Sequence, residues 1–172
     1  MPDLLILCIA VLLGSNCQEA RAPTAKRANE LTPTQVLQHL KELIGDWQAT
    51  RKSGQTVKVS YRLVARDSVL VESWLPGPGR ETLTLYHMDK DDLLATHYCA
   101  LGNQPRLRLR APSTAGVFAF DFVSATNLPD SKAGHQQRFE IRIRNADCVV
   151  RSETYVDNGK GETEEIVFRR LK

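Results

Sequence analysis

The residues of this sequence that are best suited to chemistry lie between Thr82 and Arg106. The stretch contains two of the four histidines, His87 and His97, and it also contains Cys99. Imidazole and thiol groups bind metals, transfer protons and act as nucleophiles. A functional site is therefore sought here first, and its chemistry depends on whether these side chains share one face of a strand pair.

The length of the turn between the two histidines decides that question, because a shift of one residue moves a side chain to the opposite face of a sheet. A three-residue loop from Lys90 to Asp92 would pair Asp89 with Leu93. It would place a mostly apolar set on one face: Leu83, Leu85, His87, Ala95, His97 and Cys99. A loop of two or four residues would pair Met88 with Leu93 and separate the two histidines. We favour the three-residue loop, because it gathers the most apolar residues on one side.

With that register, the residues expected to bind a ligand all come from this stretch. They are His87, His97, Cys99, Leu85 and, in the turn that follows, Asn103. No catalytic residue or metal ligand is assigned, because two histidines and one cysteine lack the close spacing of a metal site. No cofactor is expected on this basis. The alternative is an inward His97 that ligates a haem iron or acts in catalysis with His87 and Cys99.

Cys99 and Cys148 are the two cysteines beyond the first 17 residues. Three states are open for them: a disulfide, two buried free thiols, or a reactive Cys99 beside His97. A disulfide or structural thiols are favoured, because cysteine is often a small buried hydrophobe. A reactive thiol would also need a third residue to orient its histidine base, and the sequence identifies none.

The chain opens with an apolar run from Leu4 to Leu13 that is too short to span a bilayer. Its length is typical of the core of a secretory signal, so residues 1–17 are interpreted as a signal peptide or lipoprotein leader. The residues before Cys17 resemble the cleavage site of bacterial lipoproteins, which implies lipidation of Cys17. Residues 18–34 have no apolar period and are interpreted as a tether. The protein is therefore expected to be periplasmic, secreted or an outer-membrane lipoprotein, with a membrane contact only through that lipid.

One amphipathic helix is predicted after the tether. Five apolar residues recur at helical spacing: Val36, Leu37, Leu40, Leu43 and Ile44. Thr32 can cap the start of this helix, Pro33 suits its first position, and Gly45 ends it.

From Gly45 onward the apolar residues alternate with polar ones, which is the period of a half-buried strand. Strands are expected at 47–52, 57–63, 69–75, 82–88, 93–100, 106–110, 117–124, 139–144, 149–156 and 163–171. An open sheet of this size would leave one apolar face and two edges uncovered, and closure into a barrel removes both problems. Residues 35–172 are therefore expected to form one all-β domain, a closed up-and-down antiparallel barrel of about ten strands with one N-terminal helix.

The Gly45-Asp46-Trp47 segment, placed between a short helix and the first strand, resembles the Gly-x-Trp signature of lipocalins and of the wider calycin superfamily. That resemblance implies a barrel that holds small hydrophobic ligands. It also implies a structural role for Trp47, which would close one end of the barrel and pack against Arg169 or Arg170. The Thr82 to Arg106 stretch resembles a group of uncharacterised bacterial exported proteins with lipocalin-like sequences, and this likeness implies the fold alone.

The charge of the chain argues against nucleic-acid binding. The net charge of the 172 residues is only +3, and the arginines alternate singly with apolar residues, so no nucleic-acid partner is expected. A barrel of about ten strands encloses more space than its own side chains fill. We therefore expect a protein that is not an enzyme and that binds a small, largely apolar molecule in its lumen. A luminal enzyme or haem barrel built on His97, and a filled barrel that presents its arginines to a protein partner, are the alternatives.

Overall fold

The computed structural model describes residues 30–75, 77 and 79–172. The predicted leader at 1–17, most of the tether, and Pro76 and Pro78 of an expected turn lie outside the described residues. The folded part begins before residue 35, because Leu31 forms an isolated bridge with Ser113.

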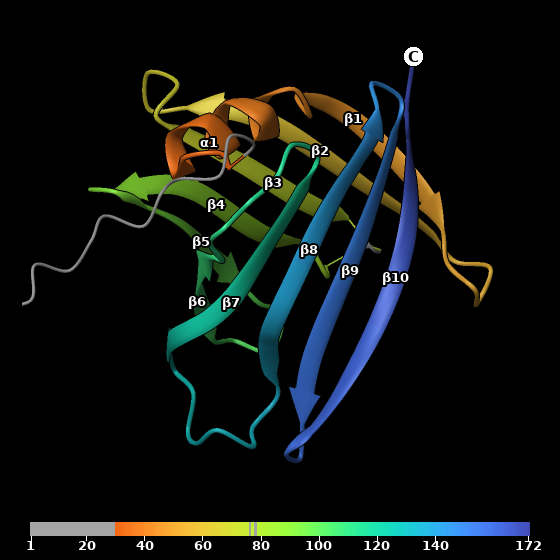
Figure 1. Cartoon of the computed structure of the whole chain (residues 1–172). Coiled ribbons are helices and arrows are strands. Elements are labelled where there is room, and N and C mark those ends of the chain that lie inside the picture. The colour runs from red at the N-terminus through yellow and green to blue at the C-terminus, as the bar shows by residue number, and fades with distance from the viewer. Residues whose placement is uncertain (1–29, 76, 78) are drawn as a thin grey trace, which may run out of the picture.

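Ten antiparallel strands form one closed barrel, as the alternating sequence predicts (Figure 1). They are β1 (Gly45–Thr50), β2 (Thr56–Val64), β3 (Val69–Leu75), β4 (Thr82–Asp89), β5 (Asp92–Tyr98), β6 (Gln104–Leu109), β7 (Val117–Thr126), β8 (His135–Asn145), β9 (Cys148–Asp157) and β10 (Lys160–Arg170). Each strand pairs with its neighbours in the sequence, and β1 pairs with β10 to close the ring.

The one α-helix of the described residues, α1 (Pro33–Lys41), lies at one end of the barrel (Figure 1). Thr32 caps it, and the Gln35 side chain accepts a hydrogen bond in return from the Thr32 backbone nitrogen, 2.8 Å away. The buried face of α1 consists of Val36, Leu37 and Leu40. Among the described residues, no helix has the length and apolar character needed to cross a membrane.

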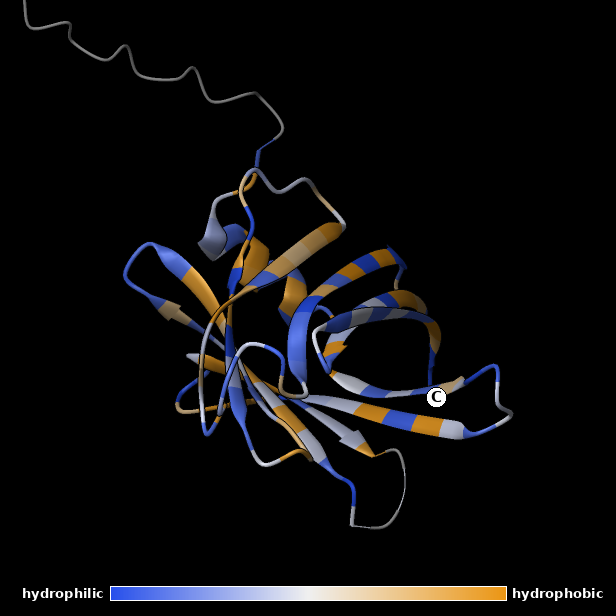
Figure 2. Cartoon of the chain, turned by 90° about the horizontal axis from the view of Figure 1, so that it is seen from below, coloured by the Kyte–Doolittle hydropathy of each residue, from blue (hydrophilic) through white to orange (hydrophobic). Residues whose placement is uncertain are grey.

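Hydrophobic and hydrophilic residues alternate along the strands (Figure 2). The inward residues near α1 form a dense apolar core that includes Trp47, Phe118, Phe120, Phe139 and Ile141. This core fills the half of the lumen that α1 covers. The opposite end is bounded by the β1–β2, β3–β4, β5–β6, β7–β8 and β9–β10 connections.

Arg170 closes the helix-covered end around Trp47. Its guanidinium lies over the indole ring, 4.2 Å from the ring centroid. The same group donates to the backbone oxygens of Glu42, Ile44 and Ala146 at 2.7–2.8 Å. Of the two arginines considered for this role, Arg170 therefore occupies it.

The seam between β1 and β10 is short. Within the described residues these strands pair only at Trp47 with Arg170 and at Gln48 with Arg169. The first half of β10 is exposed and pairs with β9 alone. The described barrel wall therefore lacks strand pairing between β1 and β10 beside the β1–β2 turn, at the end remote from α1.

Candidate functional site

The β4–β5 hairpin has a two-residue turn of Lys90 and Asp91, so the favoured three-residue loop is wrong. Met88 pairs with Leu93, and Thr84 pairs with His97. Lys90 has a φ of 54°, a conformation that allows the tighter turn. The extra apolar residues counted for the longer loop did not decide the register, because the outward positions of β4 tolerate half-buried apolar side chains.

This register separates the predicted ligand-binding residues. His97 points inward and is 3% exposed. His87 and Leu85 belong to the opposite, outward set of β4. Cys99 follows His97 by two residues and remains on the luminal side, where it lines a cavity. Asn103 is buried, donates to the backbone oxygen of Gly134 at 2.7 Å, and is not part of the cavity lining.

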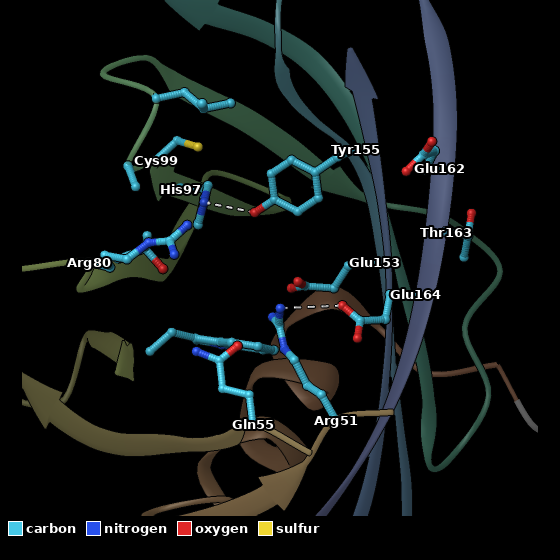
Figure 3. Close-up of a pocket in the computed structure, with 14 residues that line it drawn as sticks. Arg51, Gln55, Arg80, His97, Cys99, Glu153, Tyr155, Glu162, Thr163 and Glu164 are labelled. Carbon is cyan, nitrogen blue, oxygen red and sulfur yellow. Dashed lines mark hydrogen bonds and ion pairs between the residues drawn. The ribbon is translucent and has the colours of Figure 1, made fainter. Parts of the chain in front are cut away.

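A cavity of about 530 Å³ occupies the end of the lumen that α1 leaves open. Its size lies within the range of small-molecule sites. The lining comes from several strands and turns, and Figure 3 shows its polar side chains converging on one space: Arg51, Arg80, His97, Glu153, Tyr155 and Glu164. Trp74, Thr82 and Leu101 supply less polar surface.

Beneath the cavity, Glu72 on β3 and Arg151 on β9 form an ion pair inside the barrel. The two side chains are 0% and 2% exposed, and Arg151 Nη1 lies 3.2 Å from Glu72 Oε2. Trp74 Nε1 and the Tyr86 hydroxyl also donate to Glu72, both at 2.7 Å. Tyr61 hydrogen-bonds the same carboxylate, and these donors together offset much of the penalty of burying its charge.

Glu153 is a second carboxylate beside the same guanidinium. Its Oε1 atom accepts from Arg151 Nε at 3.0 Å and from Gln136 Nε2 at 3.2 Å. Burial, followed by the charge of Glu72, raises the pKa of Glu153 despite the opposing effect of Arg151. The network therefore holds two carboxylates for one buried guanidinium, and Glu153 is the one that lines the cavity.

His97 and Tyr155 form the polar floor next to Glu153. His97 Nε2 lies 3.2 Å from the Tyr155 hydroxyl, and His97 Nδ1 lies 3.0 Å from the Thr84 hydroxyl. Burial lowers the pKa of His97 from 6.5 to about 4, so its imidazole is neutral near pH 7. A neutral ring with both nitrogens already hydrogen-bonded suits recognition and positioning better than proton abstraction.

Cys99 and Cys148 are both free thiols, so the disulfide alternative is wrong. Cys148 is buried near the helix-covered end, at the start of β9. Burial raises the pKa of the Cys99 thiol, which keeps it protonated and weakly nucleophilic. Among the described residues, no group of three or more histidine, cysteine, aspartate or glutamate side chains could hold a metal ion.

Glu72, Glu153 and Tyr155 lie on predicted strands and could face inward, but the sequence does not predict that Glu153 and Tyr155 lie beside His97. The signal was present as Arg151, Glu153 and Tyr155, which alternate on β9 and so share a face. It could not show that this face meets Glu72, because the two strands are 79 residues apart at the Arg151–Glu72 contact. Arg51 and Arg80 come from turns, where alternation carries no information.

Comparison with known proteins supports the fold alone. No family model matches the chain, and no match was found among curated proteins. A solved structure from Nostoc punctiforme, a protein of unknown function in the DUF3598 family, is similar with a TM-score of 0.51 and 13% identity. The similarity covers 88% of this chain and 53% of that one, so this chain spans about half the length of its structural neighbour. The chain is thus a ten-stranded antiparallel barrel, and its similarity to this structure supports the fold alone.

Proposed function

We propose that this protein binds a small molecule in the open half of its lumen, as lipocalin-like barrels do. The observation that carries the proposal is the 530 Å³ cavity with a buried polar floor. The apolar core ends below it, so the space is not a packing defect within hydrophobic side chains. A ligand pocket usually combines a few fixed polar groups with a larger, mostly apolar lining.

The lining favours an amphipathic ligand over the largely apolar one expected from the sequence. His97, Glu153 and Tyr155 would bind a polar group at depth, while Trp74 and Leu101 would contact a less polar body. Burying an apolar ligand directly against the Glu153 carboxylate would remove water from that group without replacing its hydrogen bonds.

A cavity-filling variant tests this function. Thr82→Trp places an indole in the cavity, whereas the matched control Thr96→Trp places one on the outward face of β5. Native mass spectrometry and solvent extraction of the purified protein should find a small molecule that the control retains and Thr82→Trp loses. A full complement of ligand on Thr82→Trp, with folding retained, would contradict luminal binding.

We also propose that the protein is exported. The support is the Leu4 to Leu13 apolar run and the cleavage-like segment before Cys17. Cell fractionation with intact-mass measurement would test it: a mature chain that begins near residue 17 is expected, with an added lipid mass if Cys17 is the anchor. An uncleaved chain in the cytoplasm would overturn this part of the proposal.

A further inference from the structure

We infer that the cavity selects an organic cation, such as a protonated amine, which it anchors on Glu153. This inference rests on the proposed luminal binding and adds the chemical class of the ligand. It is drawn from the charges that face the cavity, the hydrogen bonds of the buried network, and the aromatic surfaces nearby.

The first argument is the charge balance of the buried network. Arg151 is already neutralised by Glu72, whose carboxylate accepts from Arg151, Trp74 and Tyr86. Glu153 shares the same guanidinium and has no buried cation of its own. Arg51, the other cation that acts on Glu153, is shared with Glu164. Three carboxylates, Glu72, Glu153 and Glu164, thus share two cations, Arg151 and Arg51, so one negative charge is in excess beside the cavity and a ligand cation would compensate it.

The second argument is the direction of the free oxygen. The hydrogen bonds of Glu153 with described residues all fall on Oε1, from Arg151 and Gln136. Its carboxylate points toward the cavity (Figure 3). The other oxygen, Oε2, is thus placed to accept from a ligand, and an ammonium donor makes the stronger, charge-assisted bond.

The third argument is the wall on which Glu153 lies. Glu153 pairs directly across the strands with Glu164, and Glu162 pairs with Tyr155. Two like charges placed opposite each other repel, which favours a cation between them. Arg51 partly compensates the charge of Glu164, because its Nη1 atom lies 3.6 Å from Glu164 Oε2. This long ion pair allows a ligand cation to compete for the carboxylate.

The aromatic surfaces suit the same ligand class. The rings of Trp74 and Tyr155 line the cavity. The face of an indole or phenol ring attracts a cation. Arg80 also lines the cavity, but its side chain is exposed, so water screens its positive charge.

The pH dependence of binding follows from the protonation of Glu153. Because the pKa of Glu153 is raised in the free protein, an ammonium ligand must displace its proton at low pH. Affinity for a cation should therefore fall about tenfold per pH unit below that pKa and be constant above it. The charged and titratable groups that face Glu153 from the surrounding elements are Arg151, Tyr155, Glu72, Arg51, Glu164, His97, Cys99, Arg80 and Glu162.

Isothermal titration calorimetry with three probes of similar size tests the inference. The probes are 2-phenylethylamine, the neutral 2-phenylethanol and the anionic 3-phenylpropanoate. At pH 8 the amine should bind about tenfold more tightly than either other probe, since a charged hydrogen bond is replaced by a neutral or repulsive contact. Below the pKa of Glu153, amine binding should release a proton, seen as a heat that depends on the buffer.

Glu153→Gln keeps the shape and the Arg151 contact and removes the charge. It should weaken amine binding about tenfold, abolish the proton release and leave 2-phenylethanol unaffected. Glu140→Gln, on the outward face of β8, is the matched control and should bind the amine as the natural protein does. A melting curve of each variant checks that it is folded.

The outcomes separate this inference from the proposed function. Tighter binding of 3-phenylpropanoate, or amine binding that Glu153→Gln leaves unchanged, would overturn the cation anchor while luminal binding stands. Absence of binding by all three probes would also overturn the cation anchor. Luminal binding would then be tested separately, by native mass spectrometry of the ligand that the purified protein carries.

Discussion

At the scale of single residues, Arg151 is a buried charged side chain that contacts two carboxylates. Its guanidinium is buried between Glu72 and Glu153 and lies 3.7 Å from the centroid of the Phe139 ring. Its Nη2 atom has no hydrogen-bond partner among the described residues. The arginine thus links two carboxylates from different strands, and each would lose its opposite charge if Arg151 were removed.

Arg151→Met should therefore lower the free energy of unfolding by about 3–5 kcal/mol, the usual effect of leaving a buried charge without its partner. Urea denaturation followed by tryptophan fluorescence measures it. Arg144→Met is the control, because Arg144 is exposed on β8 and its replacement should change stability by less than about 0.5 kcal/mol. Equal effects of the two substitutions would contradict the role of the buried ion pair.

The burial of His97 predicts how the free energy of unfolding depends on pH. Its pKa is about 4 in the folded protein and 6.5 in a free histidine, so the unfolded chain binds more protons between these values. Its contribution to stability is present above pH 6.5 and is lost as the pH falls toward 4, by about 3 kcal/mol. His97→Gln cannot titrate, so the stability difference between the natural protein and the variant should shrink or reverse over this interval. A constant difference in urea denaturation at pH 4, 5, 6 and 7 would show that His97 is not buried neutral.

At the scale of elements, α1 and the last residues of β10 form one unit through Arg170. The guanidinium donates hydrogen bonds to two backbone oxygens after the helix and to one backbone oxygen in the β8–β9 turn, and it lies over the face of Trp47. These contacts hold the helix end and the first strand against the last strand. One side chain therefore joins segments more than 120 residues apart in sequence.

Arg170→Ala should destabilise the fold by about 2–3 kcal/mol, because several charge-assisted hydrogen bonds and a cation–π contact are lost together. Arg169→Ala is the matched control, since Arg169 is the exposed neighbour on the same strand, and it should be nearly neutral. Thermal unfolding of both variants measures the difference. A neutral Arg170→Ala would mean that Trp47 and α1 are held by apolar packing alone.

The elements themselves were largely predictable, and their register was not. Val69–Leu75 forms β3 with the predicted bounds, because a short, nearly continuous apolar run that ends at a turn is typical of a strand that is buried on both faces. The β4–β5 turn was predicted with the wrong length, because two and three residues differ by little in local preference while reversing every side chain. The polar floor was beyond prediction for a related reason: Glu72 and Arg151 meet only once the whole barrel has closed.

At the scale of the whole molecule, the barrel is closed but its final edge is only partly covered. The exposed first half of β10 pairs with β9 and carries Glu162, Glu164 and Glu165. Charged side chains on an uncovered strand discourage pairing with another chain. The acidic residues of this segment thus protect the edge, and two of them, Glu162 and Glu164, also line the cavity.

Replacing both Glu162 and Glu164 with Val should increase self-association, because it turns the open edge into an apolar strand. Analytical ultracentrifugation over a range of concentrations measures the effect. The control replaces Glu140 and Arg142 with Val on β8, which is paired on both sides at these positions. Association of the control to the same degree would indicate general surface hydrophobicity as the cause.

The short β1–β10 seam also has a consequence for the order of events during folding. β1 and β10 are the strands farthest apart in the sequence, so joining them carries the largest loss of chain entropy of any strand pairing in the barrel. In the described part of the chain, β1 and β10 pair at two positions, and a backbone hydrogen bond from Leu171 to Asp46 and the Arg170–Trp47 contact also stabilise the seam. The same step brings Glu164 beside Arg51 and completes the wall of the cavity. If the lumen binds a ligand as proposed, closure of the ring and the ability to hold that ligand should arise together, late in folding, and a partly folded chain should not retain the ligand.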